Sequence, residues 1–154
     1  MKSILISACL LGVPCRYDGK SRPKIDEEAL TLLKSIYNLI PVCPEIYGGL
    51  PTPRTASERV GDRVIMKDGT DVTENYRLGA EITLDFARLF DCSLALLKEK
   101  SPSCSPNLIY DGTFSGTLTE GRGVTAELLG ACGVEVIGES KLSELIEKIL
   151  DNHV

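Results

Sequence analysis

The sequence has almost no histidine. The only one, His153, lies next to the end of the 154-residue chain, where we expect a frayed terminus. This scarcity disfavours a Cys–His nucleophile, a histidine general base and a histidine-ligated zinc site. We therefore expect the chemistry to use cysteine, serine, carboxylate, lysine, arginine or tyrosine side chains.

Long apolar runs and a surplus of positive charge are also lacking. No apolar run approaches the roughly 20 residues of a membrane-spanning helix, so we expect no membrane association. The formal net charge is −5 and no basic block occurs, which argues against a nucleic-acid duplex as partner. The apolar stretch of the N-terminal MKSILISACLLG is short and interrupted by polar residues. We interpret it as a first strand of a cytoplasmic protein rather than a signal peptide.

The order of apolar patterns predicts the fold. Short apolar runs at 3–8, 38–42, 93–98 and 134–137 alternate with helical periodicity, and Asp26, Thr73 and Ser140 are the expected helix N-caps. This alternation is typical of an α/β fold. We predict one Rossmann-like three-layer domain over residues 1–154, with a parallel sheet of about four strands in the order 2-1-3-4. Asp68–Gly69, within residues 64–73, predicts a small β-hairpin insertion.

Two segments read as loops rather than as regular structure. Residues 43–54 contain three prolines and two glycines, so we expect no helix or strand there. Residues 98–123 form a long segment in which Cys104 stands between Pro102 and Pro106. Long loops inside compact domains are usually functional or disordered. The interleaved apolar residues favour an ordered, functional loop.

Six cysteines are many for a cytoplasmic chain of this size. Such usage indicates metal binding or catalysis more often than disulfides. Cys9, Cys43 and Cys104 each follow shortly after a predicted strand. Because the carboxyl ends of parallel strands meet at one edge of a sheet, we expect these three thiols to converge. Cys92 and Cys132, at helix ends, are interpreted as small apolar side chains.

Converging thiols leave several functions open. A zinc site that adds Cys15 as fourth ligand and an iron–sulfur cluster held by three thiolates are both compatible with the spacing. A thiol-redox sensor that uses Cys9 and Cys15 is another hypothesis, as is a zinc- or cluster-bearing carrier that stores or delivers sulfur. Glu45 and Ser101 lie close to two of the thiols in the sequence, where a carboxylate and a hydroxyl favour proton transfer.

Two arginines and a second serine are candidate substrate-binding residues. Arg16 and Arg54 offer planar donors for an anionic or carbonyl-rich ligand, and Ser103 lies directly before Cys104. The alternative interpretation places the arginines in solvent and the serine in a turn.

Three segments resemble the thiouracil desulfidase family over nearly the whole chain. They are SACLLGVPCRYDG at 7–19, VCPEIYGGLPTPR at 42–54 and KSPSC…IYDGTFSGTLTEGRGVTAELL at 100–129. The resemblance implies a [4Fe-4S] cluster held by Cys9, Cys43 and Cys104, with one iron free of protein ligands. It also implies that Glu45 and Ser101 act in acid–base steps.

The reaction implied by this resemblance is a desulfuration without redox change. A thiolated nucleobase such as thiouracil would be converted to its oxo form with release of hydrogen sulfide. The expected partners are therefore a small thiocarbonyl substrate and hydrosulfide, and a homodimer is left open. Two departures from the family pattern bear on the pocket: Ser105 replaces the usual glycine after SPSC, and Thr55 and Ala56 replace the prolines after PTPR.

Overall fold

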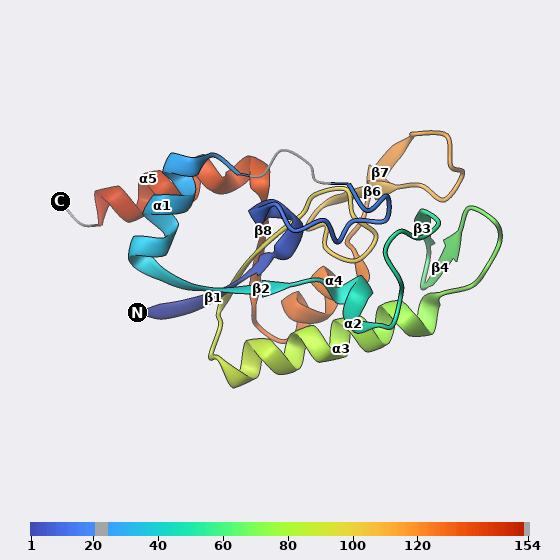
Figure 1. Cartoon of the computed structure of the whole chain (residues 1–154), viewed down its shortest axis with the longest axis horizontal. Coiled ribbons are helices and arrows are strands. Elements are labelled where there is room, and N and C mark those ends of the chain that lie inside the picture. Colours follow the sequence, from blue (N-terminus) through green and yellow to red (C-terminus); the bar gives the residue numbers. More distant parts are fainter. Residues whose placement is uncertain (21–24, 153–154) are drawn as a thin grey trace.

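A four-stranded parallel sheet forms the centre of the protein. The computed structural model describes residues 1–20 and 25–152 (Figure 1), so His153 lies outside the described residues. The sheet order is β2-β1-β5-β8, built from β1 (Lys2–Ser7), β2 (Tyr37–Val42), β5 (Leu94–Leu97) and β8 (Glu135–Gly138). Counted along the chain, this is the predicted order 2-1-3-4, and the α/β fold is confirmed.

Helices cover both faces of the sheet (Figure 1). On one face lie α1 (Glu27–Ile36) and α5 (Leu142–Asp151), and on the other lie α3 (Thr73–Leu89) and α4 (Val124–Ala131). Successive strand residues point to opposite faces. Leu5 therefore packs in the core cluster on the side of α3 and α4, while Ile6 packs in the cluster on the side of α1 and α5. This alternation produces the expected three layers.

The three predicted helix caps have different outcomes. Asp26 caps α1, because its carboxylate accepts the N–H of Ala29 at 3.2 Å. Thr73 is the first residue inside α3 rather than its cap, and its hydroxyl oxygen accepts the N–H of Val64 at 2.8 Å. Ser140 lies in a 3₁₀ turn, η2 (Glu139–Lys141), before α5. The predictions for Thr73 and Ser140 are therefore wrong. The Thr73 hydroxyl bonds to β4 instead of capping the helix, and the turn that contains Ser140 ends before α5 begins.

The predicted chain reversal at Asp68–Gly69 exists, since an antiparallel bridge joins Ile65 and Asp71 across it. A hairpin that was not predicted precedes it. Its strands are β3 (Ser57–Val60) and β4 (Arg63–Met66), so the chain reverses near Gly61. Asp68–Gly69 forms a second, tight turn in which the Gly69 N–H donates to Met66 at 2.8 Å. The strand β3 was missed because its sequence, SERV, contains one apolar residue among polar ones.

Short regular elements also occur in the two segments predicted as loops. Residues 43–54 contain a four-residue helix, α2 (Pro44–Tyr47), with proline at its first position, where the missing N–H costs nothing. Residues 98–123 contain a second hairpin, formed by β6 (Leu108–Tyr110) and β7 (Leu118–Glu120). The prediction of a wholly irregular chain in residues 43–54 is therefore wrong.

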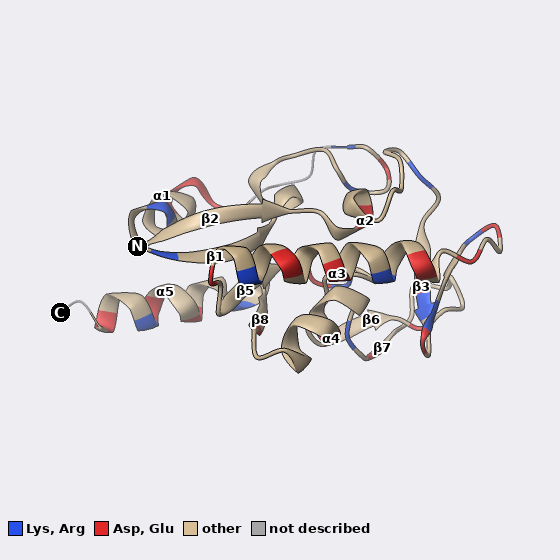
Figure 2. Cartoon of the chain, turned by 90° about the horizontal axis from the view of Figure 1, so that it is seen from below, with Lys and Arg blue, Asp and Glu red and all other residues tan. Residues whose placement is uncertain are grey.

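The outer surfaces of the helices are charged. Acidic and basic residues are interspersed along α3 and α5 (Figure 2). Among the described residues, no helix is both long enough and apolar enough to cross a membrane.

Candidate functional site

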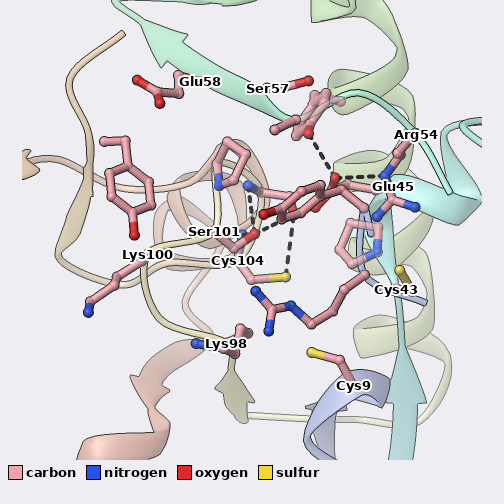
Figure 3. A pocket seen from close by; sticks show the side chains of 18 of the residues that line it. Cys9, Cys43, Glu45, Arg54, Ser57, Glu58, Lys98, Lys100, Ser101 and Cys104 are labelled. Atoms are coloured by element: carbon pink, nitrogen blue, oxygen red, sulfur yellow. Dashed lines mark hydrogen bonds and ion pairs between the residues drawn. The ribbon is translucent and has the colours of Figure 1, made fainter. Parts of the chain in front are cut away.

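A cavity of about 400 Å³ lies at the carboxyl edge of the sheet and brings the predicted thiols together (Figure 3). Cys9 lies in a 3₁₀ turn, η1 (Ala8–Leu11), directly after β1. Cys43 directly follows β2, and Cys104 lies in the loop after β5. All three line the cavity, together with Cys15. Three segments far apart in the sequence thus present sulfur to one space.

The short helix α2 is fixed by very close contact with α3. A Cβ atom on Gly79 would lie 1.9 Å from the carbonyl oxygen of Pro44, and one on Gly48 would lie 2.0 Å from that of Asn75. Only glycine permits this approach. The Asn75 amide also donates to the carbonyl of Gly48 at 2.9 Å. As a result α3 sets the position of α2 and of Glu45, which α2 carries into the cavity wall.

The loop that carries Cys104 is held by backbone hydrogen bonds. The hydroxyl oxygen of Ser101 accepts the N–H groups of Ser103 and Cys104, each at 3.1 Å. At the start of α4, the N–H of Val124 donates to the Pro102 carbonyl at 2.9 Å, and that of Thr125 donates to the Ser103 carbonyl at 2.8 Å. The loop is therefore anchored from within and by α4.

Glu45 is the centre of a buried hydrogen-bond network. Its Oε1 atom accepts the phenol of Tyr76 at 2.8 Å and the Nε–H of Arg54 at 3.1 Å. Its Oε2 atom accepts the hydroxyl of Ser103 at 3.0 Å. Ser103 in turn lies 3.0 Å from the hydroxyl of Ser101. The structure thus connects Glu45 and Ser101, two predicted site residues, through a third.

Tyr76 was not identified from the sequence. It is only 1% exposed and lies four residues before Ala80, so both belong to the buried stripe of α3. A tyrosine in such a stripe resembles an ordinary core residue. The signal that could have identified it is the hydroxyl group, because a buried tyrosine hydroxyl usually has a hydrogen-bond partner.

The two predicted substrate-binding arginines differ in their surroundings. The Arg54 side chain is 3% exposed and contacts Glu45, the Pro51 carbonyl, the Thr52 hydroxyl and the Cys15 carbonyl. Four of its five N–H donors are therefore engaged by the protein, which favours a structural role. Arg16 lines the cavity and has no ion-pair partner in the described part of the chain, so it is free to meet a ligand.

Burial holds the thiols of Cys9 and Cys104 in their protonated form. Desolvation, followed by the charge of Cys43, raises the pKa of Cys9 to about 11. Desolvation also raises the pKa of Cys104 to about 12. A hydrogen bond between Cys15 and Cys43 lowers the pKa of Cys43 and raises that of Cys15. A bound metal must therefore displace protons from these thiols.

The donors gathered around the cavity are compatible with an iron–sulfur cluster. Zinc holds its sulfur ligands at about 2.3 Å, so they must be gathered around one point. Among the described residues, no three Cys, His, Asp or Glu side chains are gathered in this way. An iron–sulfur cluster spreads its thiolates over several iron atoms. The all-sulfur set around one cavity is therefore compatible with a cluster.

Three comparisons relate the chain to known proteins. The family model described as 2-thiouracil desulfurase matches residues 4–141. The uncharacterised protein YbbK of Bacillus subtilis (strain 168) is 39% identical over 159 aligned positions, which cover 93% of this chain and 99% of YbbK. The solved structure of the [4Fe-4S]-dependent thiouracil desulfidase TudS is similar with a TM-score of 0.90 and 42% identity, over 97% of this chain and 98% of the other.

Proposed function

The chain belongs to the 2-thiouracil desulfurase family, and on this premise we propose that it replaces the thiocarbonyl sulfur of a thiouracil-like base with oxygen and releases hydrogen sulfide. The overall change consumes one water molecule and transfers no electrons. The observation that carries the proposal is the meeting of three thiols and the hydrogen-bonded Glu45 in one cavity. The likeness to TudS supports an iron–sulfur enzyme.

Cys9, Cys43 and Cys104 are the residues proposed to hold the cluster. Three thiolates on four irons leave one iron without a protein ligand, and the bound cluster would supply a soft, open coordination position suited to a thiocarbonyl sulfur. Cys15 contacts Cys43, and Arg54 donates to the Cys15 carbonyl at 2.9 Å. We assign Cys15 to the support of Cys43 rather than to the ligand set.

The serines form a directed path for protons. Both lone pairs of the Ser101 hydroxyl are taken by backbone N–H groups, so its own proton points to Ser103. The Ser103 hydroxyl then donates to the Glu45 carboxylate at 3.0 Å, a stronger acceptor than the Cys104 sulfur at 3.5 Å. Ser103 is thus proposed to relay protons rather than to bind substrate.

Glu45 is proposed as the general base at the end of this path. It takes a proton from the water that attacks the thiocarbonyl carbon and gives it to the departing sulfur as the carbon–sulfur bond breaks. The second proton of the water passes to the same sulfur, which leaves as hydrogen sulfide. Its two oxygens are fixed by three donors from separate segments. A base held in this way loses no orientational freedom during the reaction.

Two wider expectations belong to the same proposal. The six cysteines are all unpaired, as is usual in a reducing compartment, and we propose a cytoplasmic location. The proposed partners are a small thiocarbonyl substrate and hydrosulfide, and a homodimer stays a prediction.

The deciding experiment is turnover of 2-thiouracil by anaerobically reconstituted protein. Uracil and sulfide should appear in equal amounts, and the iron-free protein should form neither. A sulfur carrier would bind sulfur without repeated turnover. The absence of turnover of any thiocarbonyl heterocycle by protein with a full iron and sulfide content would contradict the proposed function.

A further inference from the structure

A buried carboxylate lies in the wall of the cavity away from Cys9. It belongs to Glu58 on β3. In Figure 3, Ser101 and Cys104 lie between Glu58 and Cys9. Glu58 is only 9% exposed. The thiols and the Glu45 network do not involve it.

Glu58 uses one of its two oxygens to hold the neighbouring loop. Its Oε1 atom accepts the N–H of Gly112 at 2.9 Å and the N–H of Phe114 at 3.1 Å. In the described residues, no group donates to its Oε2 atom, which stays open to solvent, and no cation lies within ion-pair distance of the carboxylate. Lys67 and Lys100, which also line the cavity, are among the cations that do not pair with it.

Solvent reaches the second oxygen in the free protein, but a ligand that displaces this water must supply a donor of its own, because a charged acceptor without a partner is costly. Here both loop contacts fall on the same oxygen, so the loop does not need the second one. The second oxygen is left as an acceptor in a residue that lines the ligand cavity. A ligand that fills this part of the cavity is therefore expected to bring a donor for it.

We propose that Glu58 accepts a hydrogen bond from the substrate and so selects thiocarbonyl heterocycles that carry a donor on the edge away from the sulfur. This inference rests on the proposed function, since the thiocarbonyl must face the thiols. The donor is an N–H of the ring or an O–H of a group attached to it. A heterocycle with only acceptors on that edge would meet the carboxylate unfavourably and bind weakly.

Glu58→Gln separates recognition from loop support. The amide keeps one oxygen for the N–H groups of Gly112 and Phe114, but it turns an NH₂ group toward the cavity. The KM for 4-thiouracil, whose N1–H lies opposite the thiocarbonyl at C4, should rise roughly 10- to 100-fold, as expected for loss of a hydrogen bond to a charged group. The kcat should stay within about threefold, because the contact is equally present in the ground state and transition state.

Methylated substrates identify the donor. In the wild-type protein, methylation of the donating ring nitrogen should raise KM as much as Glu58→Gln does, and the variant should show no further loss with that compound. If 4-thiouridine remains sensitive to Glu58→Gln while 1-methyl-4-thiouracil does not, the donor is a sugar hydroxyl. Glu120→Gln is the control, since Glu120 is exposed on β7 and does not line the cavity.

Binding of the product gives a second measurement that needs no turnover. The Kd of uracil for cluster-loaded protein should rise in Glu58→Gln by a similar factor. An unchanged KM and Kd would overturn the inference, as would a loss of thermal stability and cluster that explains any change. Failure of the wild-type protein to desulfurate any substrate would contradict the proposed function, while the Kd comparison would still decide the role of Glu58.

Discussion

Tyr76 donates a 2.8 Å hydrogen bond to Glu45 and so joins α3 to the carboxylate that α2 brings into the cavity wall. Desolvation and the charge of Glu45 both raise the pKa of Tyr76, so the phenol remains a donor. Arg54 donates to the same oxygen. With that oxygen fixed, the other one is directed to Ser103.

Tyr76→Phe should therefore impair catalysis without loss of the cluster. Removal of a hydrogen bond to a charged group costs about 1.5–3 kcal/mol, and we expect kcat to fall roughly tenfold or more with little change in KM. Steady-state kinetics with iron and sulfide analysis tests this. Tyr47→Phe is the control, because the hydrogen bond from the Tyr47 hydroxyl to the Pro41 carbonyl, at 3.3 Å, is exposed to solvent. A Tyr76→Phe protein with the kcat of wild type would show that Glu45 needs no support from α3.

Glu45→Gln should retain the fold and the cluster while it loses most of its turnover. General acid–base groups typically contribute about 10²–10⁴-fold to rate, and the amide cannot take up a proton. Single-turnover assays with 2-thiouracil measure the effect. The matched surface variant, Glu74→Gln, removes an exposed partner of Arg77 and should leave the rate unchanged. Wild-type kinetics in Glu45→Gln would remove Glu45 from the mechanism.

Serine replacements of Cys9, Cys43 and Cys104 should each lose most of the iron. Two thiolates hold a four-iron cluster poorly, and these three are the proposed ligands in the cavity. Iron and sulfide content after anaerobic purification, together with visible absorbance, gives the answer. Cys92→Ser is the control, since Cys92 lies in the apolar core rather than in the cavity wall. Full cluster content in any of the three variants would remove that cysteine from the ligand set.

The sheet and the meeting of the thiols were accessible from the sequence for a simple reason. Apolar runs identify strands, and connection rules then limit the order of a short parallel sheet. Each thiol near a strand end is therefore carried to the same edge. By contrast, the link from Tyr76 to Glu45 spans 31 positions, and no local pattern reports it.

The missed details share the same physical origin. Thr73 resembled a helix cap, but its hydroxyl accepts from Val64 on β4, so tertiary contact replaces local capping. Gly48 lay in a segment predicted to be irregular, and Gly79 carried no prediction. Their function is visible only once α2 and α3 are side by side. Arg54 offered donors for a ligand, and the folded chain uses four of them itself.

Gly79→Ala should destabilise the protein and its cluster site. In an exposed helix interior this change usually stabilises by about 1 kcal/mol, but here the new Cβ would lie 1.9 Å from the Pro44 carbonyl oxygen. Separation of α2 from α3 should lower the free energy of unfolding by roughly 1–3 kcal/mol and displace Cys43 and Glu45. Thermal unfolding and iron content measure both effects.

Gly130→Ala is the matched control for this prediction. Gly130 also lies in a helix, α4, but its nearest neighbour would be the guanidinium of Arg122, which is the flexible end of a side chain. We expect unchanged or slightly raised stability. A fall in stability as large as that of Gly79→Ala would mean that helix geometry, not the contact with Pro44, explains the result.

Cys15→Ala distinguishes the support of a ligand from two other roles. Cys15 lines the cavity, so it is also placed to be a fourth metal ligand or to carry sulfur as a persulfide. Its carbonyl is held by Arg54 and its thiol contacts Cys43, which fits support. The variant should retain its iron and turn over 2-thiouracil within a fewfold of wild type, with sulfide and uracil formed in equal amounts. Cys132→Ala, at an exposed position, controls for general loss of a thiol.

Loss of iron in Cys15→Ala alone would indicate a four-cysteine site. An extra sulfur atom on Cys15 during turnover, found by mass spectrometry of the wild-type protein, would instead indicate that this cysteine carries the sulfur away.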